Sequence, residues 1–221
     1  MSCCAPCSAG AIAELKLRTE NSELIAGEFS SQLSVLSSQL SDFIVLFYNP
    51  NIFPESEYQK RLGEQIKYCE SLGVKYAICG ADNYEPEHKK WLNCMRGLED
   101  EPERGARCSE CFKMRFEFGA RWAREHGYNA IASVFGVSRH KNQKQVDEAA
   151  RMVVGAHNCV PLPRSGNKVI APGGATGHNY VPLQYFVINW NESLRQKINK
   201  ASEFYRQNYC GCEYSRIANN L

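Results

Sequence analysis

Three short apolar runs separated by longer amphipathic segments constrain the fold of this 221-residue chain most strongly. The runs 43–48 ("FIVLFY"), 74–80 ("VKYAICG") and 129–134 ("NAIASV") have the length of strands, and the segments between them have helical spacing. Strands that are apolar on both faces and are separated by helices predict a parallel sheet covered on both sides. We therefore expect an α/β fold with its functional site at the carboxyl ends of the strands.

The remaining pattern predicts one domain over residues 1–221 with one insertion. Helices are expected over about 8–18, 22–40, 56–73, 109–126, 140–157 and 191–208 and around Trp91, with Ser56 near one N-cap and Gly73 at the end of the same helix. Residues 161–190 are rich in Gly, Pro and Asn and contain one strand-like piece, 183–190. We interpret this region as an inserted loop or hairpin.

Cysteine usage points to metal or redox chemistry. The chain has eleven cysteines and a formal charge of only +2, so any nucleic-acid surface must come from local clustering of Arg and Lys. Its sequence shows neither a secretion signal nor a run of about 18 apolar residues, which predicts a cytoplasmic protein without a membrane span. In a reducing compartment a disulfide framework is not expected, which leaves metal binding or redox catalysis.

Seven of the cysteines form three compact groups at the start, middle and end of the chain. The groups are "CCAPC" (Cys3, Cys4, Cys7), "CSEC" (Cys108, Cys111) and "CGC" (Cys210, Cys212). Cys108 and Cys111 share one face of a helical first turn, where the helix dipole favours thiolates. Gly211 allows the backbone to approach a bulky group.

Seven thiols exceed the four ligands of one tetrahedral zinc, so the sequence predicts two metal centres. Adjacent Cys3 and Cys4 are expected to diverge and to serve different centres. Soft thiolates in this number favour an iron–sulfur cluster with a second ion beside it. A thioredoxin-like dithiol at Cys4 and Cys7 is the alternative for that group. The isolated Cys69, Cys79, Cys94 and Cys159 are interpreted as small buried hydrophobic residues.

Five motifs resemble those of the QueH-type epoxyqueuosine reductases, in the same order from Cys3 to Ser215. They are "CCAPCS", "FYNPNI", "EPERGARCSECFKMR", "SRHKN" and "FYRQNYCGCEYS". The resemblance implies a Rossmann-like, nucleotide alpha-hydrolase-type fold with a 4Fe–4S cluster beside one additional iron ion. It also implies a cobalamin-independent oxidoreductase that removes the epoxide oxygen of epoxyqueuosine at the wobble position of tRNA, the last step of queuosine biosynthesis.

The chain departs from the family pattern in its first residues and at two motif positions. The family usually has a short apolar strand before the cysteine pair, whereas only Met1 and Ser2 precede it here, so we expect either that the first strand is missing from this chain or that the start was assigned too late. Arg139 stands where proline is common, and some relatives carry aspartate at the position of Cys7. Because both thiolate and carboxylate ligate iron, Cys7 is a candidate ligand of the single ion.

Polar residues around these motifs are the candidates for substrate contact. His140 is the candidate proton donor, with a metal-bound water as the alternative. The candidates for binding are Tyr48, Asn49, Asn51, Arg104, Arg107, Lys141, Asn142, Arg206 and Gln207. Loop pinning by ion pairs is the competing interpretation for Glu103, Arg104 and Arg107, and a turn role competes at Asn49 and Asn51. Tyr205 and Tyr209 are candidates for base stacking or for the core.

Two other functions remain compatible with parts of the pattern. A non-catalytic, zinc-stabilised tRNA-binding module would use the same cysteines. A tRNA thiolase would need a pyrophosphate loop, and "APGGATG" at 171–177 lies too late in the chain for one. Because the sequence shows no glycine fingerprint for flavin or nicotinamide, we expect an external electron donor of the ferredoxin or flavodoxin type.

Overall fold

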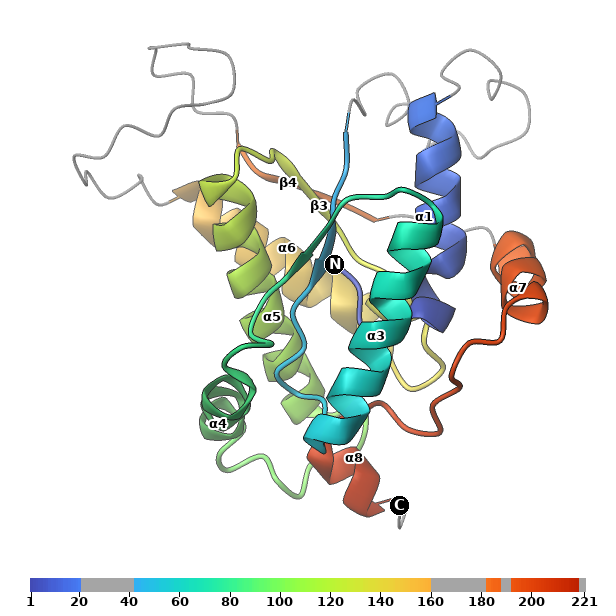
Figure 1. The fold of residues 1–221 in the computed structure, drawn as a ribbon. Coiled ribbons are helices and arrows are strands. Elements are labelled where there is room, and N and C mark those ends of the chain that lie inside the picture. The colour runs from blue at the N-terminus through green and yellow to red at the C-terminus, as the bar shows by residue number, and fades with distance from the viewer. Residues whose placement is uncertain (21–41, 160–181, 188–191, 219–221) are drawn as a thin grey trace.

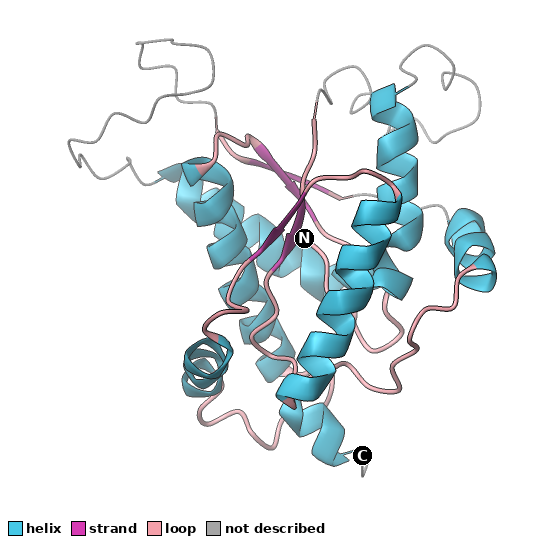
Figure 2. Cartoon of the chain, viewed as in Figure 1, coloured by secondary structure: helices cyan, strands magenta, loops and turns pink. Residues whose placement is uncertain are grey.

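The structure is a computed structural model that describes residues 1–20, 42–159, 182–187 and 192–218. In chain order its elements are α1 (Ala5–Glu20), β1 (Val45–Phe47), α3 (Glu55–Ser71), β2 (Tyr76–Ile78), α4 (Tyr84–Cys94), α5 (Ala106–Glu125), β3 (Ala130–Ala132), the 3-10 turn η1 (Phe135–Val137), α6 (Gln143–Cys159), β4 (Gln184–Phe186), α7 (Glu192–Ala201) and α8 (Glu213–Ala218). The described part is mixed α/β and mostly helical, with short strands at its centre (Figures 1 and 2).

The strands form two parallel pairs. Strand β1 pairs with β2, with Leu46 opposite Ala77, and β3 pairs with β4, with Ile131 opposite Tyr185. The expected parallel pairing is therefore confirmed. The described residues form two small sheets in place of one long sheet.

Met1 and Ser2 lie between the two pairs. The Ser2 amide donates to the Leu46 carbonyl at 3.0 Å, and the Val134 amide donates to the Met1 carbonyl at 3.2 Å. The Met1 nitrogen donates to the Ala132 carbonyl at 2.5 Å. These two residues thus occupy the position of a strand between β1 and β3, and they lead directly into the first cysteine group.

Several helix boundaries differ from the sequence expectations. Helix α1 begins at Ala5, so Cys7 lies in its first turn. Helix α3 begins at Glu55 and not after Ser56, because the Pro54 carbonyl already accepts from the Glu57 amide at 2.9 Å. The expected helix 191–208 ends at Ala201, and the chain then runs irregularly to residue 212.

Part of the expected insertion is a strand of the fold. Residues Gln184–Phe186 form β4, which pairs in parallel with β3 and so does not form a hairpin with it. Residues 160–181 and 188–191 of that region, and the expected helix over 22–40, lie outside the described residues.

Two large apolar clusters hold the strands between helices. One contains Cys3, Cys4 and Phe116 together with side chains of β3 and α6. The other joins α1, β1 and α3 through residues such as Ala9, Val45 and Cys69. The first cysteine group is thus built into the core itself. None of the helices that the structure describes is long and apolar enough to span a membrane.

Candidate metal centre

Three thiols from the start of the chain meet at one point. The Sγ atoms of Cys3, Cys4 and Cys7 all lie within 4.8 Å of one another, and those of Cys3 and Cys4 are 3.9 Å apart. Cys3 and Cys4 are buried, and Cys7 is half-buried. We call these residues the N-terminal thiol group.

The expectation that Cys3 and Cys4 diverge is wrong. Neighbouring side chains diverge in regular strands and helices, but these two residues lie in the irregular turn between Ser2 and the start of α1 at Ala5. The turn brings both sulfurs to the same side, where Cys7 joins them from the first turn of α1. The spacing fits one metal ion, because tetrahedral ligation at a metal–sulfur distance of about 2.3 Å separates sulfurs by about 3.8 Å.

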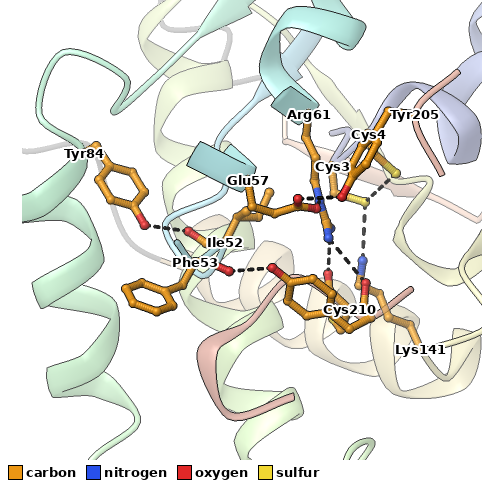
Figure 3. A network of polar contacts seen from close by, with 11 residues as sticks. Cys3, Cys4, Ile52, Phe53, Glu57, Arg61, Tyr84, Lys141, Tyr205 and Cys210 are labelled. Carbon is orange, nitrogen blue, oxygen red and sulfur yellow. Dashed lines mark hydrogen bonds and ion pairs between the residues drawn. The ribbon is translucent and has the colours of Figure 1, made fainter. Parts of the chain in front are cut away.

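Two buried cations accompany this group. The Lys141 ammonium lies 3.3 Å from the Cys3 Sγ, and Lys141 is only 8% exposed (Figure 3). Hydrogen bonds with Cys4 and Cys7 lower the pKa of Cys3 well below its usual range, and the charges of Lys141 and Arg115 act in the same direction. Although burial lowers the pKa of Lys141, the charges of Cys3 and Cys210 raise it above its usual range overall.

The remaining grouped cysteines are Cys108, Cys111, Cys210 and Cys212, which we call the second thiol group. Cys111 and Cys212 pack in one buried cluster, but among the described residues these four sulfurs do not have the close ligand spacing of the N-terminal thiol group. Burial, reinforced by the neighbouring charge of Cys210, raises the pKa of Cys108 to about 11. Burial also raises the pKa of Cys111 and Cys212, again with Cys210 contributing. Burial thus opposes the helix dipole, which was expected to favour thiolates at Cys108 and Cys111.

A single buried arginine holds the 209–212 segment in place. Arg61 of α3 pairs with Glu57 at 2.7 Å and donates to the backbone carbonyls of Cys210 at 3.0 Å and Tyr209 at 3.4 Å (Figure 3). Gly211 has φ +108°, and a Cβ there would lie 2.6 Å from Arg61 Nη1. The glycine of "CGC" is therefore needed for the close approach of this guanidinium.

The same segment is also tied to the chain that follows β1. Cys212 forms an antiparallel bridge with Ile52, and the Phe53 amide donates to the Gly211 carbonyl at 2.8 Å. The Tyr209 hydroxyl donates to the Phe53 carbonyl at 2.6 Å. Tyr209 is therefore buried, which fits the core role, one of the two roles expected for it.

Arg61 and Arg115 are functional residues that the sequence reasoning missed. Arg115 of α5 is fully buried, lies 3.6 Å over the ring of Phe135, and donates to the Tyr48 carbonyl and to the Asn49 side chain. Both arginines occur in a stripe of core-facing helical positions, and a charged residue in such a stripe was the available signal.

A cavity of about 820 Å³ opens beside the N-terminal thiol group. Its lining includes all three thiols of that group, Cys210 of the second group, and the predicted residues His140, Lys141, Arg206 and Gln207. Segments from the start, middle and end of the chain therefore meet at one site. Tyr209, a candidate for base stacking, also lines this cavity, and the other candidates for substrate contact do not.

The predicted residues after β1 lie in the protein interior. Tyr48 is buried, donates to Glu87 at 2.8 Å and stacks on Phe118 with ring centroids 3.7 Å apart. Asn49 is fully buried and donates to the Ser2 carbonyl at 3.1 Å. Asn51 is also buried, and its Oδ1 lacks a hydrogen-bond partner among the described residues. Tyr48 and Asn49 therefore hold the end of β1 in place.

Three candidates for substrate contact form hydrogen bonds with neighbouring residues of the chain. Arg107 is buried and donates to the carbonyls of Leu98 and Glu99, which is the loop-pinning role. Arg104, at φ +68°, donates its amide to the Cys108 Sγ at 3.2 Å. Asn142 is exposed and accepts from the Gln145 amide at 3.4 Å, at the start of α6.

His140 lies on the cavity wall beside a carboxylate. Its Nδ1 is 3.7 Å from Glu103 Oε2, and its side chain is 17% exposed. Burial lowers the pKa of His140, whereas the charge of Glu103 raises it. Glu103 also accepts from the Ser215 hydroxyl of α8, so it links the C-terminal helix to the imidazole.

The isolated cysteines differ among themselves. Cys69 is fully buried and Cys79 is half-buried, as expected for packing residues. The expectation is wrong for Cys94, which is exposed because the last residue of α4 lies away from the buried face of Trp91. The side chain of Cys159 lies outside the described residues.

The fold and the site together define a cysteine-rich α/β protein whose closest thiols are spaced as ligands of a metal ion. A family model described as "Epoxyqueuosine reductase QueH" matches residues 25–218. The chain belongs to this family of QueH epoxyqueuosine reductases.

Relatives that carry this name share a third or slightly less of the sequence. The protein of Acinetobacter baylyi is 33% identical over 218 residues, which cover 97% of this chain and 78% of the relative. That of Haemophilus influenzae is also 33% identical over 218 residues, covering 97% of this chain and 69% of the relative. That of Thermotoga maritima is 29% identical over 173 residues, covering 77% and 78%. The likeness to the first two therefore extends over nearly the whole chain.

Proposed function

We propose that this chain reduces epoxyqueuosine to queuosine in tRNA, as the last step of queuosine biosynthesis. The observation that carries the proposal is the N-terminal thiol group, which opens into a basic cavity in a chain of the QueH family. The reaction takes two electrons and two protons. The two epoxide C–O bonds break, an alkene forms, and the oxygen leaves as water.

Each thiol group suits one metal centre. Three thiols within 4.8 Å suit a single iron ion with an open position for the substrate oxygen. The four residues Cys108, Cys111, Cys210 and Cys212 match the four ligands of a 4Fe–4S cluster. When bound, the cluster supplies electrons one at a time and the iron polarises the C–O bond as a Lewis acid.

Buried cations support this assignment, because thiolates accumulate negative charge in a water-poor site. Lys141 lies 3.3 Å from Cys3 and, together with Arg115, lowers the pKa of that thiol. A buried ammonium without an anionic partner would be unfavourable, so its position favours a site made of thiolates. Lys141 therefore acts on the metal ligands, in place of the substrate contact expected from the sequence.

Protons come from groups on the cavity wall. His140 lies on that wall with Glu103 Oε2 3.7 Å from its Nδ1, and its Nε2 accepts from Arg139 Nε at 3.4 Å, a contact that the substrate oxygen would replace. We assign His140 the proton transfer to the leaving oxygen, and Glu103 the orientation of the ring.

The arrangement of the strands supports the finer fold assignment. Met1 and Ser2 bridge the β1–β2 and β3–β4 pairs, which gives the parallel spatial order β2, β1, Met1–Ser2, β3, β4. This order supports a Rossmann-like sheet with its site at the carboxyl ends. An external ferredoxin- or flavodoxin-type protein is the proposed electron donor.

The function is tested by product analysis. Protein reconstituted with iron and sulfide under anaerobic conditions is incubated with dithionite and epoxyqueuosine-containing tRNA, which is then digested to nucleosides. Mass spectrometry should show loss of one oxygen from the modified nucleoside. The same spacing of Cys3, Cys4 and Cys7 also suits zinc. A colourless zinc protein that binds tRNA and gives no conversion would therefore support the binding-module alternative.

A further inference from the structure

We propose that helix α7 is the docking surface for the phosphate backbone of the tRNA anticodon stem-loop, and that Lys197 and Lys200 are its main contacts. This inference rests on the proposed function. It moves the RNA-binding surface away from the expected patch of Arg104, Arg107, Lys141 and Arg206, of which only Lys141 and Arg206 line the cavity.

The charge of the cavity wall is the first argument. Its described lining contains no Asp or Glu, and it contains seven Arg and Lys residues: Arg61, Arg139, Lys141, Arg195, Lys197, Lys200 and Arg206. The chain as a whole carries only +2, so this one-sided distribution is local. A cavity lined by one sign of charge concentrates ligands of the opposite sign.

Six of the seven cations divide into two sets, and the seventh, Arg195, packs on α1. Arg61 is buried and pairs with Glu57, and Lys141 is buried and contacts the Cys3 thiol. Both cations therefore already have partners within the protein. Lys197, Lys200, Arg139 and Arg206 are exposed. Among the described residues, no carboxylate lies within ion-pair distance of Lys197, Lys200 or Arg206. Cations of this second set are available to an external anion.

The lysines of helix α7 line the cavity because the other faces of the helix pack against the rest of the protein. Arg195 packs closely on α1, because a Cβ added at Gly10 would lie 2.8 Å from the Cβ of Arg195. Asn199 donates to the Pro6 carbonyl at 2.9 Å, and Ile198 packs against the cluster of α1, β1 and α3. Ser193, Gln196, Lys197 and Lys200 have i, i+3, i+4, i+7 spacing and all line the cavity.

Helix α7 lies close to the candidate metal site, so RNA docked on this helix would lie near the thiols. The helix lies beside α1 (Figure 1), and Pro6, which Asn199 contacts, is one residue from Cys7. Arg206 donates to the Asn199 carbonyl at 3.4 Å and continues the basic edge toward Cys210. An RNA strand held along this edge has its bases directed toward the thiols, where a base that leaves the stack can be reduced.

Polyphosphate and tRNA both present a chain of phosphate groups, so the experiment compares the binding of the two. The double variant Lys197→Glu/Lys200→Glu is measured against Lys89→Glu/Lys144→Glu. The control makes the same charge change at exposed lysines of α4 and α6 that do not line the cavity. Binding of epoxyqueuosine-containing tRNA, its unmodified transcript and polyphosphate is followed by filter binding from about 50 to 200 mM salt.

The α7 variant should bind both tRNAs at least about tenfold more weakly, with the salt-dependence slope reduced by about 1.4 to 1.8. The control should bind like the wild type, and both variants should keep the wild-type metal content. Equal binding and slope for the two variants would overturn the inference. A loss limited to polyphosphate would overturn it as well. If the wild type binds tRNA through α7 but gives no conversion, the proposed function fails and this inference stands.

Discussion

The two thiol groups are built in different ways. The N-terminal thiol group comes from five consecutive residues, Cys3 to Cys7, and its sulfurs lie within 4.8 Å of one another. The second thiol group joins the first turns of α5 to a segment about a hundred residues later, and tertiary contacts through Arg61 hold that segment. A locally formed site tolerates distant change, whereas a site assembled from remote segments depends on each contact that holds it together.

The electrostatic surroundings differ in the same way. The pKa of Cys3 is lowered by its partner thiols and by two buried cations, whereas burial raises the pKa of Cys108, Cys111 and Cys212. The first group resembles the site of a compact, single ion. Under the proposed function, the second group would hold the larger iron–sulfur cluster.

The largest effect should come from removing thiols of the second group. Cys108→Ala or Cys212→Ala should lower epoxyqueuosine reduction by at least about 100-fold, because loss of a ligand exceeds the 10- to 100-fold effect of its neighbours. Cys69→Ala is the matched control, since Cys69 is fully buried but lies outside both groups. It should keep activity and lose about 1–2 kcal/mol of stability. Full activity of the grouped variants would refute the assignment.

Replacing Arg61, which holds the second thiol group in place, should have the next largest effect. Arg61→Met removes the ion-pair partner of the buried Glu57 carboxylate and leaves it only the Tyr205 hydroxyl, which should lower the free energy of unfolding by about 3–5 kcal/mol. Lys67→Met on the same helix removes an exposed pair at 3.8 Å and should change it by less than about 1 kcal/mol. Urea unfolding measures both. A similar loss in the two variants would show that Arg61 has no special role.

The glycine between the last two thiols sharpens the comparison further. Gly211→Ala forces a side chain into φ +108° and against Arg61, whereas Gly73→Ala meets φ +63° with nothing within 4 Å. We expect a loss of about 2–3 kcal/mol for the first variant and about 1 kcal/mol for the second. Thermal unfolding tests this. Equal losses would mean that backbone conformation alone matters at Gly211.

A smaller effect is expected at the N-terminal thiol group. Lys141→Met removes the ammonium that lies 3.3 Å from Cys3 and should weaken iron retention by about 10- to 100-fold, and Lys141→Arg should restore part of it. The rate of iron loss to a chelator is the measurement, with the exposed Lys144→Met as control. Unchanged retention in Lys141→Met would remove this lysine from the metal site.

The sequence predicted the elements well and their long-range contacts poorly. Apolar runs and helical spacing were enough for the parallel strands β1 to β3 and for most helices, because these patterns are local. Strand β4 was expected only as a strand-like piece of an inserted loop or hairpin, and its pairing with β3 was not predicted. Spacing also identified the seven grouped cysteines. It could not show that Cys3 and Cys4 converge, since the turn that brings them together is irregular.

The roles of the charged residues depended on tertiary structure. Arg107 and Lys141 were expected to contact substrate, but the fold buries both and gives them carbonyl and thiol partners. The cavity cations of α7 were missed because Lys197 and Lys200 occur in a helix with no motif around them. Which face a helix presents to a cavity depends on what covers its other faces.

Metal analysis of two single variants tests the central claim most directly. Iron, acid-labile sulfide and zinc are measured in anaerobically reconstituted wild type, Cys7→Ala and Cys111→Ala. The wild type should hold about five iron and four sulfide per chain. Cys7→Ala should lose about one iron and keep its sulfide, and Cys111→Ala should lose its sulfide and keep about one iron. Zinc without sulfide in the wild type, or loss of all iron together in both variants, would contradict the account.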